Sequence, residues 1–172
     1  MRFAMPRFSI RPETAADVDA IDRITRAAFQ HHPHSDQTEH LIIARLRAAG
    51  VLTLSLVAEQ NGQMIGHAAF SPVTFPGTSA GWYGLGPIAV APHSQGQGAG
   101  AALVQHGLEL LRARGAAGCV VLGEPAYYGR FGFSHRADCV FAGAPAPYFQ
   151  VLAFGNSQAS GEVAYHAAFA PD

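Results

Sequence analysis

The most specific chemical signal in the sequence lies in a loop of six residues: Gln95, Gly96, Gln97, Gly98, Ala99 and Gly100. The loop lies between a β-rich segment and a segment with helical periodicity. Glycine lets the backbone approach a ligand closely, and the free N–H groups at the start of a helix favour a phosphate. The loop therefore predicts a phosphate-binding site with a pyrophosphate as its ligand, although a plain glycine-rich turn fits the same residues.

The same glycines also match the G-x-G-x-x-A fingerprint of dinucleotide-binding folds, with Glu124 about 20 residues further on. In those folds the fingerprint starts at the end of the first strand, whereas here the segment Ala91–Ser94 and a long stretch of different pattern come first. The chain also has no room for a second mononucleotide half and a substrate domain. A nicotinamide-dependent enzyme is therefore the weaker alternative.

The strand that should position this loop runs from Trp82 to Val90 and contains Gly84, Gly86 and Pro87. Proline cannot donate a hydrogen bond to a sheet, and glycine in a strand often marks a bulge. We expect a bulged strand that pairs along only part of its length. Such a strand leaves backbone groups free for a ligand.

After the loop, a helix should continue to about Arg114 and bury a stripe formed by Val104, Leu108 and Leu111. The apolar strand Cys119–Leu122 follows, so strand, helix and strand predict a right-handed parallel crossover. A short helix over Pro125–Arg130 should end at the segment Phe131-Gly132-Phe133.

Other elements are expected on both sides of this central unit. Before it we expect a strand at Phe8–Arg11, a helix over Ala15–Phe29 with the capping-box pair Thr14 and Asp17, and a helix from Asp36 to Gly50 with Ile42, Leu46 and Ala49 on its apolar face. Asn61-Gly62 predicts a tight hairpin turn between strands Leu52–Glu59 and Gln63–Ser71. Strands over Tyr148–Phe154 and Glu162–Phe169 should end the chain, which gives an α/β fold with a mixed sheet and helices on its faces.

The composition excludes several classes of function. Charged residues make up 13% of the 172 residues and the formal net charge is -1, so no basic surface is expected to attract nucleic acid or anionic lipid. All 11 basic residues are arginine, which excludes Schiff-base and P-loop lysine chemistry. Cys119 and Cys139 have no CxxC spacing and indicate a reducing compartment. We expect one cytoplasmic domain over residues 1–172, with no nucleic-acid or membrane partner.

Three segments occur in a fixed order along the chain: Gly86-Pro87-Ile88-Ala89-Val90-Ala91-Pro92, then Gln95-x-x-Gly98-x-Gly100, and then Tyr128-Gly129-Arg130-Phe131-Gly132-Phe133. Together they resemble the GCN5-related N-acetyltransferase (GNAT) superfamily and, within it, the bacterial YhbS-like branch. The first two segments are similar to the fourth strand and the pyrophosphate loop of that family, and the third to its tyrosine element after the fifth strand. The resemblance covers the whole chain in the order of elements.

The resemblance implies a GNAT-like fold whose central sheet splays and binds acetyl-CoA in the gap. It assigns the cofactor to the strand residues Ile88, Ala89 and Val90 and to the loop Gln95–Gly100. Many relatives have Arg or Lys in this loop, where this chain has Gln95 and Gln97. Arg130 is therefore expected near the 3′-phosphate, where its charge would supplement the backbone dipoles.

The resemblance also implies the reaction, an acetyl transfer to a primary amine by direct attack. Tyr128 matches the family tyrosine that acts as general acid, whereas Tyr127 beside it is expected to pack. The base is left open among several candidates, with Glu39 slightly ahead because its helix should border the substrate cleft; the others are Glu124, His40, His67 and His93. A chain of water molecules would also serve.

Three further points concern ligands and partners. His31, His32, His34 and His40 lack the cysteines or paired carboxylates of a metal site and are interpreted as a solvated loop, so no metal is expected. The acceptor is expected to be a small-molecule amine, with a protein amine as the second choice, and a homodimer is neither indicated nor excluded. A non-catalytic CoA-binding sensor is the main alternative, because the phosphate loop carries no cation.

Overall fold

The computed structural model describes residues 8–77 and 80–170. The largest sheet in this part of the chain has strand order β1-β2-β3-β4-β5-β7, and β9 pairs with the far end of β3. The strands are β1 (Ser9–Pro12), β2 (Leu54–Gln60), β3 (Gln63–Thr74), β4 (Trp82–Val90), β5 (Gly118–Leu122), β7 (Phe149–Ala153) and β9 (Ala164–Tyr165). Only β4 and β5 pair in parallel within this sheet. A mostly antiparallel sheet excludes the doubly wound parallel fold of the dinucleotide-binding alternative.

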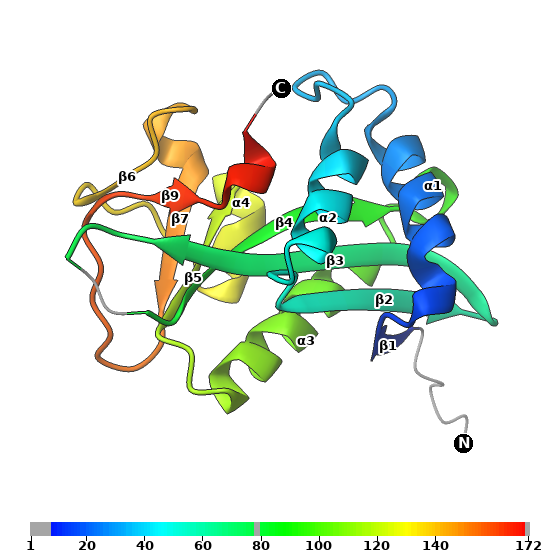
Figure 1. Cartoon of the computed structure of the whole chain (residues 1–172), viewed down its shortest axis with the longest axis horizontal. Coiled ribbons are helices and arrows are strands. Elements are labelled where there is room, and N and C mark those ends of the chain that lie inside the picture. Colours follow the sequence, from blue (N-terminus) through cyan, green and yellow to red (C-terminus); the bar gives the residue numbers. More distant parts are fainter. Residues whose placement is uncertain (1–7, 78–79, 171–172) are drawn as a thin grey trace.

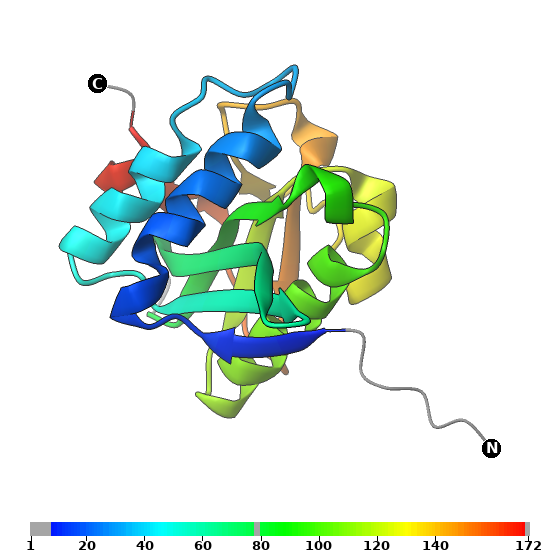
Figure 2. The same ribbon diagram turned by 90° about the vertical axis from the view of Figure 1, so that its right-hand side faces the viewer.

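Helices cover both faces of the sheet. Figures 1 and 2 show α1 (Val18–Phe29) and α2 (Glu39–Ala48) side by side on one face, and α3 (Ala99–Ala113) with the short α4 (Pro125–Tyr128) on the other. We call these the α2 face and the α3 face. Apolar residues of α3 pack on β2, β3, β4 and β5 in the largest buried cluster, which includes Phe70 and Leu103. The helices thus fix the strands that carry the phosphate loop.

The pairing of β4 with β5 stops halfway along β4. It joins Trp82–Leu85 to Gly118–Val121 and goes no further. On the other side, β4 pairs with β3, where Gly86 and Pro87 lie together opposite Ala69 and form a bulge. The two strands therefore diverge beyond Leu85, as the glycines and the proline of β4 predict.

The divergence leaves one edge of β4 open. The Ala91 N–H donates to the Ile65 carbonyl (2.8 Å), and in an antiparallel ladder such hydrogen-bonded pairs alternate with non-bonded ones. His67 and Ala89 are the next hydrogen-bonded pair, so the N–H and C=O groups of Ile88 and Val90 point away from β3 toward the open edge. These groups are available to a ligand that adds to the sheet as a strand.

Several expectations for local structure are confirmed. Asn61 and Gly62 have positive φ (53° and 76°) and join β2 to β3 as a hairpin. The capping box of Thr14 and Asp17 is present, on a 3-10 turn, Ala15–Asp17, that leads into α1. Strand β5 follows α3 and runs parallel to β4.

Other expectations were wrong. The second helix begins at Glu39 rather than near Asp36, and it buries Ile43 and Leu46 while Ala49 is exposed. The expected last strand, Glu162–Phe169, is broken into β8 (Gly161–Glu162), β9 and a 3-10 turn (Ala167–Phe169, η5). The small strand β6 (Cys139–Val140), which pairs with β8, was not expected. These short pieces are held by neighbours distant in sequence, so no local period marks them.

Gly107 of α3 should resist substitution, because a Cβ atom there would lie 2.2 Å from Cζ of the buried Phe70. Helix propensity alone predicts that Gly107→Ala stabilises the protein by about 1 kcal/mol. We expect a loss of about 1–3 kcal/mol in the free energy of unfolding, because the added methyl group overpacks the core. Urea titration measures the change.

The matched control is Gly129→Ala, where a Cβ would meet no atom within 4 Å and φ is -57°. This variant should unfold within about 0.5 kcal/mol of the wild type. Equal free energies of unfolding for the two variants would contradict this prediction and show that the Phe70 ring can move aside with no loss of stability.

Candidate functional site

A pocket of about 240 Å³ lies where the open edge of β4 meets the start of α3. Its lining comes from the end of β4, the glycine loop, the first turn of α3 and the segment after β5: Val90, Ser94, Gln95, Gly96, Gly98, Ala99, Gly100, Ala101, Tyr127 and Arg130. The pocket thus gathers residues that are up to forty positions apart in the chain.

The loop forms an anion-binding geometry at the start of α3. Gly96 and Gly98 have positive φ (77° and 96°), which a side chain would disfavour. Gly98 is the N-cap, and the first helical bond runs from the Ala102 N–H to the Gly98 carbonyl (3.0 Å). The preceding N–H groups, of Ala99, Gly100 and Ala101, have no partner inside the helix, and the helix dipole places partial positive charge there. Their position on the pocket wall suits a phosphate.

Gln95 connects the loop to the open strand edge. Its side-chain amide, Nε2, donates to the Val90 carbonyl (3.1 Å). This bond occupies the last carbonyl of β4 that points toward the open edge. A ligand that pairs with the strand at Val90 must displace the Gln95 amide.

Tyr127 lies against the first turn of α3. Its hydroxyl would be 3.1 Å from a Cβ atom placed on Gly100, so only glycine fits at that position without a shift. The Arg130 guanidinium lies 4.9 Å from the centre of the Tyr127 ring, a cation–π distance. Tyr127 and Arg130 together form the part of the pocket wall that comes from the segment after β5.

Tyr128 faces the other way, into the core next to β5. Its ring packs so closely on Gly123 that a Cβ there would lie 2.2 Å from Cε2, and it meets Tyr127 edge-on at 5.0 Å. Burial, with a smaller contribution from Tyr127, raises the pKa of Tyr128 to about 12. The phenol therefore keeps its proton at neutral pH. Because Gly123 follows β5 directly, Tyr128 is tied to the strand that diverges from β4.

Most of the residues predicted to bind a cofactor surround this pocket. Val90, Gln95, Gly96, Gly98, Ala99, Gly100 and Arg130 line it, whereas Ile88, Ala89 and Gln97 do not. Ile88 still offers backbone groups to the open edge, and the Ala89 backbone is turned toward His67 of β3. Sequence reasoning missed Ser94, Ala101 and Tyr127. The sequence could have indicated Tyr127 as a pocket residue, because it is next to the predicted Tyr128.

His67, a candidate base, is fully buried on the α2 face and is held by a chain of polar contacts. Its Nε2 lies 2.7 Å from Ser55 Oγ, the Ser55 hydroxyl donates to the Glu13 carboxylate, and Arg47 donates two bonds of 2.9 Å to Glu13. Within the described part of the chain, His67 Nδ1 has no hydrogen-bond partner. Burial raises the pKa of Glu13, but Arg47 and Ser55 outweigh it and the net shift is downward.

These contacts set the protonation of His67. Burial lowers the pKa of His67 to about 4, against a smaller opposite effect of Glu13. Because the ionised Glu13 can only accept, the Ser55 proton points to Glu13 and Ser55 Oγ accepts from His67 Nε2. Neutral His67 thus leaves Nδ1 as a bare acceptor in the interior.

The other base candidates lie at the molecular surface or near it. Glu39 begins α2, and its two carboxylate oxygens lie 2.7 and 2.8 Å from the Ser35 hydroxyl, which donates its one proton to the carboxylate. His40 is half-buried in the same turn, His93 is exposed in the 3-10 turn Pro92–Ser94, and Glu124 is the N-cap of α4. None of these four side chains lines the pocket at the start of α3.

The histidine-rich segment between α1 and α2 is exposed at His31, His32 and His34. Over residues 8–77 and 80–170, no three His, Cys, Asp or Glu side chains gather as they would around a metal ion. Within the same ranges, no helix combines the length and the apolarity that a bilayer crossing requires.

The geometry suits an extended ligand with an anionic end. The anionic end fits the free N–H groups of α3, and the extended part can pair with Ile88 and Val90 along β4. A protonated phenol, Tyr128 of α4, packs against Gly123 directly after β5, the other strand of the divergent pair. An acyl thioester carried on a pyrophosphate-containing arm has this shape.

Comparison with known proteins agrees with the geometry. A model of the acetyltransferase (GNAT) family matches residues 18–133. The chain is 38% identical over 168 residues to the uncharacterized N-acetyltransferase YhbS of Escherichia coli K12, covering 93% of this chain and 97% of that protein.

Two solved structures are similar over nearly the whole chain. A GNAT family acetyltransferase from Brucella melitensis in complex with acetyl-CoA has a TM-score of 0.84 and 50% identity, with 95% of this chain and 98% of that chain covered. YhbS from Escherichia coli in complex with CoA has a TM-score of 0.87 and 36% identity, with 98% and 95% covered.

The buried His67 should make the protein less stable in mild acid. Its pKa falls from 6.5 to about 4 on folding, so the unfolded chain binds more protons between these values, and stability is lost as pH falls through that window. We expect the free energy of unfolding to drop by about 2 kcal/mol from pH 7.5 to pH 5. The charged groups that act on His67 are Glu13, Arg47 and Asp17, and both carboxyls have lowered pKa values, so they lose their contributions only in stronger acid.

Urea titrations of the wild type and His67→Gln at the two pH values measure this effect. The variant should show little change across the window, while the control His34→Gln, at an exposed position, should keep the wild-type slope. A wild-type protein equally stable at both pH values would contradict the assignment of a neutral, buried imidazole.

Proposed function

This chain belongs to the GNAT family of acetyltransferases, and on that premise we propose that it transfers the acetyl group of acetyl-CoA to a primary amine by direct attack. It is an N-acetyltransferase, and acetyl-CoA is its co-substrate, as the complexes of its close structural relatives support. The observation that carries the proposal is the open edge of β4 that leads into the free N–H groups of α3. We further propose that residues 1–172 act as one domain.

The binding mode follows from the shape of the site. The pyrophosphate of CoA binds the glycine loop and the N–H groups at the start of α3, with Gly96, Gly98 and Gly100 keeping the loop clear of side chains. The pantetheine arm pairs with Ile88 and Val90 as an added strand, in exchange for the Gln95 contact to Val90. This mode needs no cation inside the loop.

Arg130 supplies the positive charge that the loop lacks. It is exposed, it lines the pocket, and its stacking on Tyr127 holds the guanidinium beside the loop. We assign it to the 3′-phosphate of CoA. A planar guanidinium binds phosphate through two parallel bonds, which a flexible lysine would not reproduce.

The chemical step needs a group that stabilises the oxyanion, a general acid and a general base. The amine nitrogen attacks the thioester carbonyl carbon, and the Ile88 N–H on the open edge of β4 stabilises the oxygen that becomes negative. The C–S bond then breaks, and the Tyr128 hydroxyl donates its proton to the departing thiolate. A base removes the extra proton from nitrogen; we assign this role to Glu39, directly or through water. No covalent enzyme intermediate forms, because Cys119 and Cys139 are buried and away from the pocket.

A small-molecule amine is the proposed acceptor, and a screen tests it. Acetyl-CoA consumption is followed by thiol release with small amines, amino acids and peptides. Turnover with a small amine supports the proposal. Tight binding of CoA with no turnover for any amine would instead favour the CoA-binding sensor, which the cation-free loop makes the second candidate.

Removal of the Tyr128 hydroxyl should separate chemistry from binding. Tyr128→Phe keeps the ring packed on Gly123 but cannot donate a proton, so kcat should fall about 10²- to 10⁴-fold while the Kd for CoA changes less than about twofold. Steady-state kinetics and calorimetry give the two numbers. Tyr83→Phe, the same deletion at another ring that packs on this core cluster, should leave kcat unchanged.

An unchanged kcat in Tyr128→Phe would refute the acid role and leave CoA binding untouched. A parallel loss in Tyr83→Phe would indicate a general effect on the core instead.

Loss of the Arg130 charge should weaken CoA binding in a ligand-specific way. Arg130→Gln should raise the Kd for CoA about 3- to 10-fold, since one exposed charge-assisted contact is lost. The Kd for 3′-dephospho-CoA should be the same in the variant and the wild type. Arg136→Gln, at an arginine paired with Asp138 outside the pocket, is the control and should bind both ligands normally.

A further inference from the structure

Open space borders the backbone where β4 and β5 diverge. Gly86 is the first residue of β4 beyond the last pair, Leu85 with Val121. A Cβ atom at Gly86 would meet no other atom within 4 Å. On the proposed binding mode, the phosphates lie beyond Val90 and the arm runs back along Ile88, so the acetyl group ends near Gly86.

One face of the sheet is closed to an acceptor at this point. Leu85, Val121 and Tyr128 belong to the large buried cluster on the α3 face. The opposite, α2 face carries the side chains of alternate residues, including Val73 and Trp82 in a separate buried cluster. An acceptor must therefore reach the acetyl group from the α2 face.

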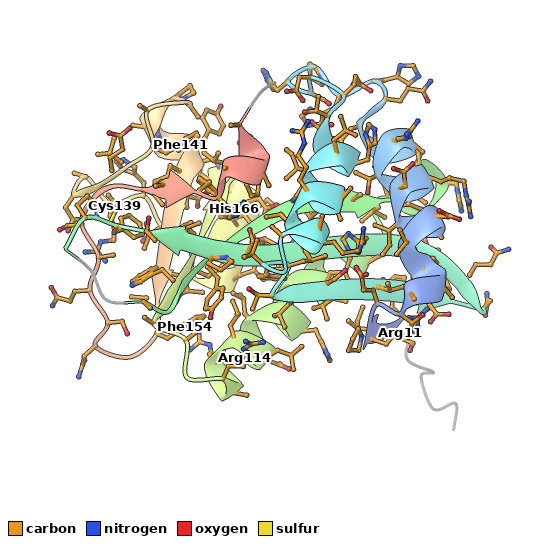
Figure 3. The ribbon with its side chains drawn as sticks, viewed as in Figure 1. Arg11, Arg114, Cys139, Phe141, Phe154 and His166 are labelled. Carbon is orange, nitrogen blue, oxygen red and sulfur yellow. The ribbon has the colours of Figure 1, made fainter. Side chains whose placement is uncertain are left out.

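An aromatic ring fills the α2 face beside the opening. A Cβ on Gly84 would lie 2.8 Å from Cε1 of Tyr165, which comes from β9 at the far end of the chain. Tyr165 meets Phe141 edge-on at 5.5 Å and Phe169 at 5.1 Å, and each of the three residues is partly exposed. Figure 3 shows Phe141 and His166 in the part of the molecule built by β6, β7 and β9. We call Phe141, Tyr165 and Phe169 the aromatic wall.

The aromatic wall adjoins α2. Phe169 lies in η5, which contacts α2, and Figure 2 shows β9 on the same side of the sheet as this helix. Glu39 is at the start of that helix. The acceptor side of the opening is thus bounded by the aromatic wall and by the helix that carries the proposed base.

The wall is uncharged, and one buried hydroxyl is free beside it. Burial raises the pKa of the Tyr165 phenol, so it stays neutral, and Phe141 and Phe169 carry no ionisable group. Ser71 of β3, in register with Gly84, is fully buried, and its hydroxyl has no hydrogen-bond partner within the described ranges. A buried polar group without a partner costs free energy, so the Ser71 hydroxyl is suited to bind a polar atom of a ligand.

We propose that Tyr165 and Ser71 select the acceptor, and that the acceptor is an amine on an uncharged apolar or aromatic carrier. The aromatic wall packs the carrier, and the Ser71 hydroxyl bonds a polar atom near the reacting nitrogen. An apolar wall with one convergent polar group is typical of sites for small organic ligands. A polyamine or a basic peptide would place further ammonium groups against the aromatic wall, whose own residues offer no carboxylate, while Glu39 is assigned to the reacting nitrogen. The inference rests on the proposed function.

The test compares acceptors at saturating acetyl-CoA. 2-Phenylethylamine and hexylamine represent uncharged carriers, and spermidine and a lysine-rich peptide represent charged ones. We expect kcat/KM for 2-phenylethylamine to exceed that for spermidine at least tenfold. Tyr165→Leu should raise the KM for 2-phenylethylamine about tenfold with little change in kcat, and the Kd for acetyl-CoA should not change. Ser71→Ala, a smaller perturbation, should shift the same KM in the same direction.

The control is Phe154→Leu, an aromatic residue of the α3-face cluster, which should leave every KM unchanged. Equal kcat/KM for charged and uncharged amines, or KM values unaffected by Tyr165→Leu and Ser71→Ala, would overturn this inference while the proposed function stands. Failure of the wild type to bind acetyl-CoA would overturn the proposed function and the inference with it.

Discussion

The interrupted pairing between β4 and β5 is the constraint on which the site depends. A sheet normally satisfies every backbone N–H and C=O group, and here the ladder stops at Leu85 because Gly86 and Pro87 form a bulge against β3. The unused groups of Ile88 and Val90 are then available for another molecule. The rest of the fold keeps the two strands apart: α3 and its core hold β4, and the antiparallel partner β7 holds β5.

The two strands carry complementary chemical groups. β4 leads into a loop of N–H donors, and β5 leads through Gly123 to the buried phenol of Tyr128. A rigid separation between donors and phenol matters more for acyl transfer than the identity of any single loop residue, because reacting groups must meet within a few tenths of an ångström. The close contacts at Gly100 and Gly123 show how that separation is kept: each has an aromatic ring where a side chain would be.

Local signals in the sequence predicted the parts of the fold that local chemistry determines. Asn61-Gly62 determines its hairpin, and the proline and glycines of β4 determine its bulge. The C-terminal third could not be read this way, because β9 is two residues long and pairs with β3 about ninety positions away. For the same reason the aromatic wall and the Ser71 hydroxyl beside it could not be predicted, because only the tertiary fold brings these residues together. Tyr127 was interpreted from the sequence as a packing residue, and the structure shows that it also lines the pocket.

The contact between the Gln95 amide and the Val90 carbonyl affects how the site exchanges its occupant. The Gln95 amide holds the hydrogen-bonding place at the Val90 carbonyl that the arm would take, so the end of the strand is satisfied by the protein's own side chain. Binding at Val90 swaps one hydrogen bond for another and adds little net free energy. CoA can therefore leave as readily as acetyl-CoA binds, because the Gln95 amide restores the hydrogen bond to the Val90 carbonyl when the ligand dissociates.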